Sequence, residues 1–303
     1  MTTSRYFQPI YSRASSIAVE MKGGAAARLA VIGAGKMAEA IVGAIVQRGV
    51  QHAGRTHVFD SNPSRMRHFA TTWPGMYKHH SVGAAVEGAD VVLLAVKPQH
   101  MPVVLEQMGG VSPDALVISI AAGCPISMFS EKLPTKSIVR CMPNTPAMIG
   151  EGMTVWTSLG CSTEQLDAAR QLISSFGDEA YVQEEHYLDM ATAIVGSGPA
   201  YVYMFIEAMI DTGVHMGFPR ETAVRLVLKT VEGSTAYLRQ SNKHISALRN
   251  DITSPGGTTA AAIYTADEGQ FRTTIANAIW AAYRRSLELG GKDSNVGPGR
   301  SQR

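Results

Sequence analysis

The sequence predicts an α/β protein, with an N-terminal Rossmann-like, doubly wound sheet followed by an all-helical C-terminal dimerisation domain. Up to Val182, short apolar runs alternate with segments whose apolar residues have helical spacing. This alternation is typical of a parallel sheet covered by helices. Beyond Val182, no segment has a clear strand pattern and long helical segments take over.

Seven apolar runs are expected to form strands. Leu29–Ile32 precedes a glycine turn and a helix, and Val91–Val96 is apolar throughout, as expected for a strand buried on both faces. The other expected strands are His57–Asp60, Leu116–Ile120, Ser137–Met142, Met153–Thr157 and Ala180–Val182, the last two at sheet edges. A second helix is expected to begin near Ser64, after the turn at Asn62-Pro63.

The second half of the chain is expected to be helical. One long helix opens at Pro199 and is broken at Gly217-Phe-Pro219, a second follows through Val231, and a third covers 271–289. Their Met- and Ala-rich faces exceed what so small a unit can bury alone, so we infer a dimerisation domain. The expected divisions are a disordered N-terminal extension over 1–27, a dinucleotide-binding domain over 28–183, a helical dimerisation and substrate domain over 184–290, and a flexible tail over 291–303.

Composition limits the classes of partner. The chain has 303 residues, 45% of them apolar and 17% charged, which is typical of a folded protein. Its 27 basic and 25 acidic residues give a net charge of +2, so no overall field favours nucleic acid or an anionic membrane. No window reaches the ~20 apolar residues of a membrane span. We therefore expect neither a nucleic-acid nor a membrane partner.

The cysteines and the N-terminal segment bear on the compartment. Cys124, Cys141 and Cys161 match no zinc or redox spacing, so we expect no metal and a reducing, cytoplasmic compartment. Residues 1–27 are rich in Ser and Thr and more basic than acidic. That composition fits an organelle-targeting peptide as well as a disordered extension, and both interpretations stay open.

A glycine motif after the first expected strand predicts a dinucleotide site. Gly33-Ala-Gly35-Lys-Met-Ala38 fits the pattern G-x-G-x-x-G/A. The first glycine permits a tight turn, the second lets a pyrophosphate approach, and the small third residue packs the helix on the strand. The motif alone is weak, but here it follows a strand and opens a helix, as the fold requires.

The end of the second expected strand carries conflicting signals about the cofactor. Asp60 stands where an acid binds the ribose 2′-OH of NAD. Ser61, Asn62, Ser64 and Arg65 follow at once, and their hydroxyls, amide and guanidinium suit a 2′-phosphate. We predict NADPH, with NADH as the alternative, because an arginine-bearing loop can turn Asp60 aside.

A glycine-rich run in the second half predicts an anion site. Asp251–Ala260 reads DITSPGGTTA and stands directly before an alanine-rich segment with a helical pattern. Backbone N–H groups at the start of a helix can hold an anion. An N-capped helix after a loop would explain Ser254 and Pro255, but not the second glycine.

Seven segments together resemble the pyrroline-5-carboxylate reductases. They follow the family's order between Leu29 and Leu289, and DITSPGGTTAA (251–261) is the most specific. The others are VIGAGKMAEAI (31–41), DSNPSR (60–65), LLAVKPQ (93–99), ISIAAG (118–123), VRCMPNTPAMIGEG (139–152) and VGSGPAYVY (195–203). The resemblance implies NADPH- or NADH-dependent reduction of 1-pyrroline-5-carboxylate to L-proline, the last step of proline biosynthesis. It also implies a helical domain that intertwines in a homodimer, often assembled into a decamer.

The resemblance further implies roles for individual residues. Ser254, Gly256, Gly257 and Thr258 are expected to hold the substrate carboxylate, and Thr259 to be the catalytic partner of the ring nitrogen. Cofactor contacts are expected from Gly33, Gly35, Lys36, Met37, Ser61, Asn62, Arg65, Ala95, Val96, Lys97, Pro98, Ala122, Gly123 and Asn144. Three alternatives stay open: a bond within its own loop for Asn144, a solvated side chain for Lys97, and a bond to its own backbone for Thr259.

One loop departs from the family's pattern. Ile245 stands where family members commonly have proline, and Arg249-Asn250 replaces a lysine–aspartate pair. We expect these differences to affect the affinity for the substrate and not the reaction class.

Two other functions fit the sequence less well. A β-hydroxyacid-type dehydrogenase would use a lysine that 199–216 lacks. A non-catalytic NADP sensor would have no use for the carboxylate cradle. A six-membered imine acid stays open as a substrate, since one methylene is worth only ~1–3 kcal/mol.

Overall fold

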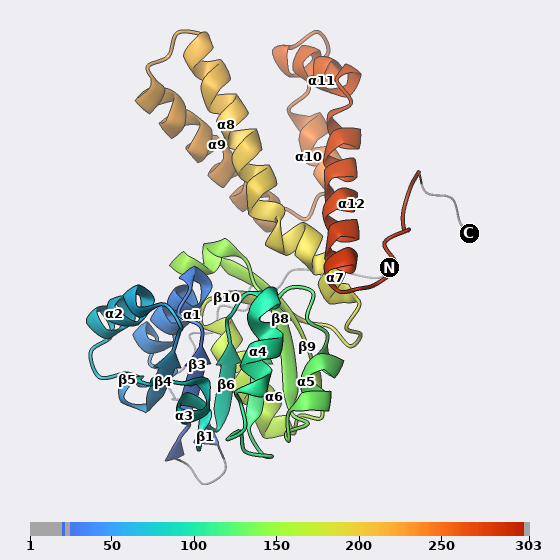
Figure 1. The fold of residues 1–303 in the computed structure, drawn as a ribbon. Coiled ribbons are helices and arrows are strands. Elements are labelled where there is room, and N and C mark those ends of the chain that lie inside the picture. Colours follow the sequence, from blue (N-terminus) through green and yellow to red (C-terminus); the bar gives the residue numbers. More distant parts are fainter. Residues whose placement is uncertain (1–19, 22–24, 300–303) are drawn as a thin grey trace. The chain divides into compact units, whose positions relative to one another are not determined.

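The computed structural model describes residues 20–21 and 25–299, which divide into two compact units (Figure 1). The sheet unit contains the described residues up to Pro199 together with those from Trp280 onward, and the helical unit is Ala200–Ile279. By these contacts, residues 184–199 and 280–290 belong to the sheet unit. The extension expected over 1–27 lies largely outside the described residues, and its described part forms the antiparallel strands β1 (Glu20–Met21) and β2 (Ala25–Ala26).

The sheet unit is built on eight strands in the order β10-β9-β8-β7-β6-β3-β4-β5. The strands are β3 (Leu29–Ile32), β4 (Thr56–Phe59), β5 (Tyr77–Lys78), β6 (Val91–Leu94), β7 (Leu116–Ser119), β8 (Ile138–Met142), β9 (Gly152–Leu159) and β10 (Gly177–Tyr181). All neighbours are parallel except β8 and β9. Because β3 lies between β4 and β6, the strand order reverses there, which confirms the predicted doubly wound sheet.

The expectation for the sheet edges was partly wrong. β9 is not an edge strand, because it lies between β8 and β10 and pairs with β8 in an antiparallel register that places Cys141 opposite Trp156. The opposite edge is β5, which the sequence analysis did not predict. Its two residues are both exposed, so no apolar pattern marks them.

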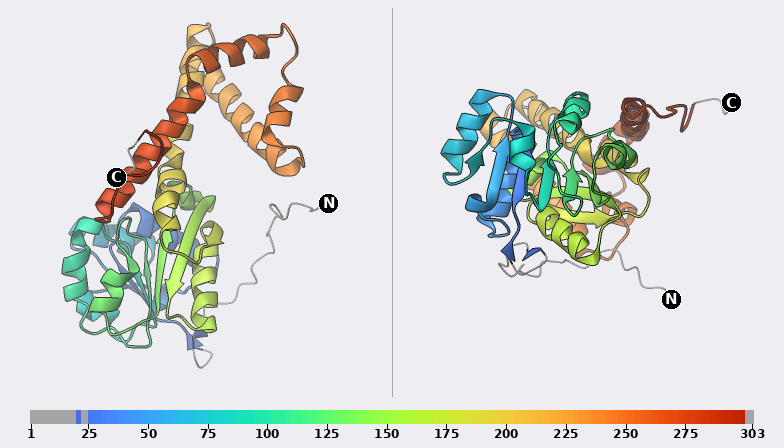
Figure 2. Two further views of the ribbon diagram at one scale, coloured as in Figure 1. Left: turned by 90° about the vertical axis from the view of Figure 1, so that its right-hand side faces the viewer. Right: turned by 60° about the horizontal axis from the view of Figure 1, so that its bottom comes forward.

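Helices cover both faces of the sheet, as the left view of Figure 2 shows. They are α1 (Lys36–Gln47), α2 (Pro63–Thr72), α3 (Val82–Val86), α4 (Met101–Glu106), α5 (Ile126–Lys132), α6 (Thr163–Ser174) and α7 (Tyr187–Ala191), with shorter turns at Ala53–Arg55, Pro98–His100 and Thr145–Ile149 and a π-helical segment at Thr192–Gly196. Along β3, Leu29 and Val31 join the core beneath α1 and α6, while Ala30 and Ile32 join the core beneath α3 and α5. This alternation is the period-2 geometry of a strand buried on both faces.

The helical unit contains α9 (Arg220–Gln240), α10 (Ile245–Asp251) and α11 (Thr258–Glu268), most of α8 (Gly198–His215), and the part of α12 (Phe271–Leu289) up to Ile279. The bounds of α12 are those predicted. The buried core of the helical unit is small and centres on Ile210, Ala223 and Val227. Many large apolar side chains remain exposed, among them Val202, Tyr203, Met204, Phe205, Leu226, Leu228, Ile252 and Tyr264. Such a surface calls for a partner, as the sequence analysis inferred.

One stretch has a property that the sequence analysis did not expect. The continuous helical segment Tyr187–His215 is long and apolar enough to cross a membrane, judged by length and composition among the described residues. The same properties suit a helix that packs against other helices.

Candidate nucleotide and carboxylate sites

The first glycine of the motif is required by the meeting of two strand ends. Gly33 has φ +99°, and its N–H donates to the carbonyl oxygen of Phe59 at 2.8 Å. A Cβ at this position would lie 2.7 Å from the carbonyl oxygen of Ala95. Only glycine combines this left-handed backbone with so close an approach. Gly33 therefore holds the ends of β3, β4 and β6 together.

The second glycine leaves open space in front of a helix N-terminus. Gly35 is the N-cap of α1 and gives it no side-chain cap, and a Cβ there would meet nothing within 4 Å. Packing therefore does not require a glycine here, whereas the close approach of a ligand to the backbone would. The unsatisfied N–H groups of the first turn suit a pyrophosphate. Beside them Lys36 is exposed, while Met37 is partly buried against the core.

The structure brings the candidate cofactor residues to one edge of the sheet. β3, β4, β6, β7 and β8 run parallel, so their carboxyl ends share an edge. The candidates that follow these ends are Gly33, Gly35, Ser61, Asn62, Arg65, Ala95, Val96, Lys97, Pro98, Ala122, Gly123 and Asn144. In open α/β sheets this edge, at the point where strand order reverses, is where ligands bind.

Asp60 braces the glycine turn with both carboxylate oxygens. Oδ2 accepts from the N–H of Ala34 at 2.6 Å, and Oδ1 accepts from the N–H of Asn62 at 2.7 Å. Asn62 in turn caps α2, because its Oδ1 accepts from the N–H of Ser64 at 2.9 Å. Asp60, the residue that favoured NAD in the sequence, thus already accepts one backbone hydrogen bond on each carboxylate oxygen.

Arg65 lies against the same turn and shares a cluster of charges with α1. Its Nε donates to the carbonyl oxygen of Ala34, and its Nη2 lies 2.7 Å from Oε2 of Glu39. Glu39 also contacts His68 Nε2 at 2.8 Å and Lys36 Nζ at 3.4 Å. Burial raises the pKa of Glu39, but the hydrogen bonds from Arg65 and His68 and the nearby positive charges outweigh this and lower it to about 2. No pattern in the sequence marks Glu39 and His68, because the residues that they contact are far away in the chain.

At the ends of β7 and β8, the candidates have structural partners of their own. Gly123 has φ +70°, and a Cβ there would lie 3.2 Å from the backbone of Leu289 at the end of α12. The amide oxygen of Asn144 accepts from the N–H of Met153 at 2.9 Å. That bond is the alternative foreseen for Asn144, and it leaves the NH₂ group of the side chain for a ligand. The side chain of Lys97 is exposed.

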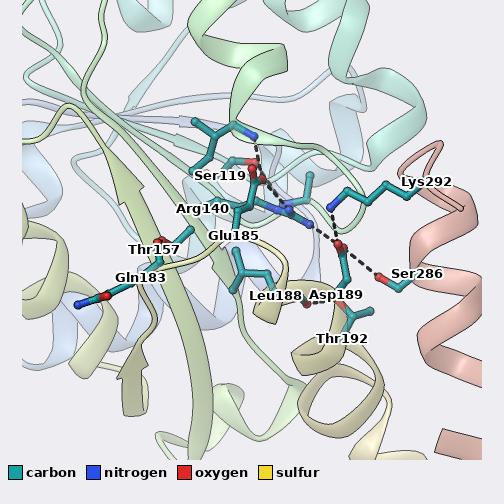
Figure 3. A network of polar contacts seen from close by, with 12 residues as sticks. Ser119, Arg140, Thr157, Gln183, Glu185, Leu188, Asp189, Thr192, Ser286 and Lys292 are labelled. Carbon is teal, nitrogen blue, oxygen red and sulfur yellow. Dashed lines mark hydrogen bonds and ion pairs between the residues drawn. The ribbon is translucent and has the colours of Figure 1, made fainter. Parts of the chain in front are cut away.

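A buried network of charges lies within the sheet unit (Figure 3). The side chain of Arg140 on β8 is 3% exposed and contacts Glu185 at 2.7 Å and Asp189 at 3.3 Å. Asp189 is 1% exposed and also binds Lys292 Nζ at 2.6 Å and the hydroxyl of Ser286 at 3.4 Å. The network joins β8, α7, the end of α12 and the segment that follows it. The sequence analysis did not find it, since its members are distant in the chain.

The glycine-rich run forms a tight turn on the helical unit. The N–H of Gly257 donates to the carbonyl oxygen of Ser254 at 3.0 Å, with Pro255 second in the turn and Gly256 third at φ +70°. This is the residue pattern of a type II turn. A Cβ on Gly257 would lie 2.5 Å from Oγ of Ser254. The second glycine therefore keeps the serine hydroxyl close to the helix start.

The start of α11 carries donors without a side-chain cap. Gly257 is its N-cap and provides no side-chain hydrogen bond. Ser254, Gly256 and Thr258 are exposed and Thr259 is half-buried. The backbone N–H groups of the first turn, together with the hydroxyls, form a cluster of donors that fits a single carboxylate.

The departures from the family lie at α10, just before this turn. Ile245 is the first residue of α10 and is exposed, a position where a proline would also fit. Ile245 and Arg249 line a cavity of about 390 Å³ with Ile263 and Phe271. Lys243, which precedes α10, and Asp251, its last residue, form an ion pair with Nζ 2.7 Å from Oδ2.

The cysteines show no sign of chemistry. All three are free; Cys124 and Cys141 are buried, and Cys161 is half-buried. Burial raises the pKa of each thiol, that of Cys161 to about 11. At neutral pH they are therefore uncharged and act as small apolar groups. The described residues contain no group of three or more His, Cys, Asp or Glu that could hold a metal ion.

Known proteins resemble the chain along most of its length. The family pattern described as pyrroline-5-carboxylate reductase dimerisation matches residues 185–289, and the pattern described as NADP oxidoreductase, coenzyme F420-dependent, matches residues 28–123. A pyrroline-5-carboxylate reductase of Pisum sativum is 39% identical over 86% of this chain and 95% of its own, and one of Synechocystis is 37% identical over 88% and 99%. The crystal structure of the Plasmodium falciparum pyrroline carboxylate reductase with NADP bound has a TM-score of 0.80 and 30% identity, covering 87% of this chain and 98% of its own.

Proposed function

Because the chain belongs to the pyrroline-5-carboxylate reductase family, we propose that it reduces 1-pyrroline-5-carboxylate to L-proline with NADPH. The observation that carries the proposal is the similarity to reductases over nearly their whole length, 95% and 99% of the two relatives above. The chain is accordingly an oxidoreductase that acts on a cyclic C=N bond. The glycine turn after β3 and the donor cluster at α11 support this reaction from the structure.

The preference for NADPH rests on Asp60 and Arg65. Both oxygens of Asp60 already accept from backbone N–H groups, so part of the acceptor capacity of this acid is used within the glycine turn. Arg65 stands beside the glycine turn and is suited to a 2′-phosphate, with Ser61 and Asn62 exposed near it. The Plasmodium relative binds NADP, which supports the same choice. NADH remains the weaker alternative.

The substrate carboxylate is assigned to the donors of the cradle, which we define as residues 254–259. The backbone N–H groups at the start of α11 have no competing side-chain cap, and the hydroxyl of Ser254 lies close to the N-cap residue Gly257, which supports this assignment. An anion there is also stabilised by the helix dipole. Binding the carboxylate fixes the position of the ring, and such positioning supplies several kcal/mol of the barrier reduction.

Little proton chemistry is required of the enzyme. NADPH, when bound, supplies the hydride that adds to the imine carbon. Protonation of the imine nitrogen makes the imine carbon a better electrophile, and after the hydride has added to that carbon the nitrogen is the amine of proline. We assign Thr259, half-buried in the first turn of α11, to hold this nitrogen through its hydroxyl.

The chain associates with itself through the region 185–289, which matches the dimerisation pattern. We propose a homodimer in which the exposed apolar side chains of the helical unit are buried against the second copy. This would also account for the apolar stretch Tyr187–His215 without a membrane. Assembly of dimers into a decamer, and a cytoplasmic location for an enzyme with three free cysteines, complete the proposal.

Turnover tests the proposal directly. Purified protein is mixed with 1-pyrroline-5-carboxylate and either NADPH or NADH, and loss of the reduced cofactor's absorbance is followed while L-proline is quantified. Proline formed in step with NADPH consumption supports the function, and a higher kcat/KM with NADPH than with NADH supports the cofactor. Binding of NADPH without any turnover would contradict the function and favour a nucleotide sensor.

A further inference from the structure

Glu39 is an acid at the place where the proposed cofactor brings negative charge. It lies in the first turn of α1, next to the glycine turn, and its side chain is 20% exposed. It contacts Arg65 at 2.7 Å, His68 at 2.8 Å and Lys36 at 3.4 Å. Its low pKa, about 2, keeps it charged at any physiological pH. Part of the positive charge gathered here is thus neutralised before any cofactor binds.

Arg65 can serve Glu39 and a phosphate at once. A guanidinium has five N–H donors, and the bonds to Ala34 and Glu39 account for its Nε and one side of its Nη2. The remaining donors suit a phosphate oxygen. Glu39 therefore need not leave when a phosphate binds, and two anions then share one arginine.

We propose that Glu39 is a specificity-determining residue that weakens binding of the 2′-phosphate and so limits the preference for NADPH over NADH. The inference rests on the proposed function, since it assumes that Arg65 meets the 2′-phosphate. Both anions would contact the same guanidinium, and unit charges that close to each other interact appreciably even at a protein surface. NADH has no phosphate at this position, so Glu39 can act on its binding only through the pyrophosphate that both cofactors share, and the charge of Glu39 affects NADH less than NADPH.

The test removes the charge and keeps the shape. In Glu39→Gln the side-chain oxygen can still accept from Arg65, but the negative charge is lost. In calorimetry we expect 2′,5′-ADP to bind the variant about five- to tenfold more tightly than it binds wild type, and the affinity for 5′-ADP to change less than twofold. The matched control is Glu106→Gln at the end of α4. The side chain of Glu106 is 71% exposed and its carboxylate lies 4.0 Å from Lys132, so this substitution should leave the affinity for both ligands unchanged.

Other variants separate the possible failures. If Arg65→Ala binds 2′,5′-ADP as tightly as wild type does, the phosphate site itself is wrong and the inference falls with it. If Arg65→Ala weakens 2′,5′-ADP but Glu39→Gln leaves it unchanged, only the role of Glu39 is wrong. Weaker binding in both Glu39→Gln and Glu39→Ala, with melting temperatures like that of wild type, would mean that Glu39 orients Arg65 and does not oppose the phosphate.

Discussion

At the carboxyl ends of β3 and β4, which we call the cofactor edge, charged side chains of the sheet unit are paired within that unit, whereas the first turn of α11 in the helical unit has no side-chain cap. At the cofactor edge, Asp60 is bonded to two backbone N–H groups and Arg65 to Glu39. At the cradle, the first turn of α11 has no side-chain cap and Ser254 and Thr258 are exposed. The same contrast holds for apolar groups, which form two large cores around the sheet and one small core in the helical unit.

This contrast indicates two ways of preparing a binding site. At the cofactor edge Arg65 is already bonded to Glu39, so we expect substitutions there to strengthen binding in some cases and to weaken it in others. At the cradle the N–H groups of α11 have no side-chain cap, so we expect substitutions there to weaken binding. In the proposed function, the helical unit has two partners, the substrate carboxylate at the start of α11 and a second copy of the chain on its exposed apolar side chains.

The largest expected effect comes from breaking the internal pairing of the sheet unit. Asp189→Ala leaves Arg140 buried with only Glu185 as an anionic partner and removes the partner of Lys292. Loss of one member of a buried ion network costs about 3–5 kcal/mol of unfolding free energy. Denaturant unfolding measures it, against Glu232→Ala, whose exposed pair with Lys229 should contribute under ~1 kcal/mol. Equal costs in the two variants would contradict internal pairing as a source of stability.

The next effect is expected at the cradle. In Gly257→Ala the new methyl group collides with the hydroxyl of Ser254 and moves it. Loss of a hydrogen bond to a charged group is worth ~1.5–3 kcal/mol, so kcat/KM for 1-pyrroline-5-carboxylate should fall about 10- to 100-fold, with KM for NADPH unchanged. Gly54→Ala is the matched control, because a Cβ there meets nothing within 4 Å. A normal kcat/KM in Gly257→Ala would refute the cradle as the substrate site.

At the cofactor edge, Arg65→Ala is expected to act on one cofactor only. Removing the guanidinium should raise KM for NADPH about tenfold through loss of a charge-assisted bond, and change KM for NADH less than twofold. Steady-state kinetics with both cofactors measures the ratio. A parallel rise for NADH would show that Arg65 supports the glycine turn through Ala34 instead of reading the phosphate.

The smallest effect concerns Thr259. Thr259→Val keeps the shape of the side chain and removes its hydroxyl, so kcat should fall several-fold while the affinity for the carboxylate stays near that of wild type. Rates at saturating substrate give kcat, and competition by L-proline gives the affinity. An unchanged kcat would contradict the role assigned to the hydroxyl of Thr259.

Local patterns predicted much of this molecule. The bounds of Leu29–Ile32 and of Phe271–Leu289 match the structure because burial on both faces of a sheet, or on one stripe of a helix, leaves a regular apolar pattern. Contacts between distant residues leave no such pattern. Asp189 and Lys292 are 103 positions apart and Glu39 and Arg65 are 26 apart, and neither pair could be found from spacing. The place of β9 inside the sheet was missed for the same reason.

The site residues divide in a similar way. Glycines were recognisable because Gly33 and Gly256 have backbones that few other residues adopt. Asp60 was predicted only as a residue that could bind ribose. Its bonds to the N–H groups of Ala34 and Asn62 depend on where its two oxygens point, and no local sequence pattern indicates that. The roles of the cradle residues toward the substrate stay predictions.

Binding of L-proline and of L-prolinamide to the protein with NADP⁺ tests the central claim most directly, namely that the helical unit holds the substrate by its carboxylate. Calorimetry should show that proline binds at least about tenfold more tightly than the amide in wild type, because only the carboxylate is an anion for the donors of α11. In Gly257→Ala the two should bind equally weakly. Equal binding of proline and its amide to wild type would contradict the account.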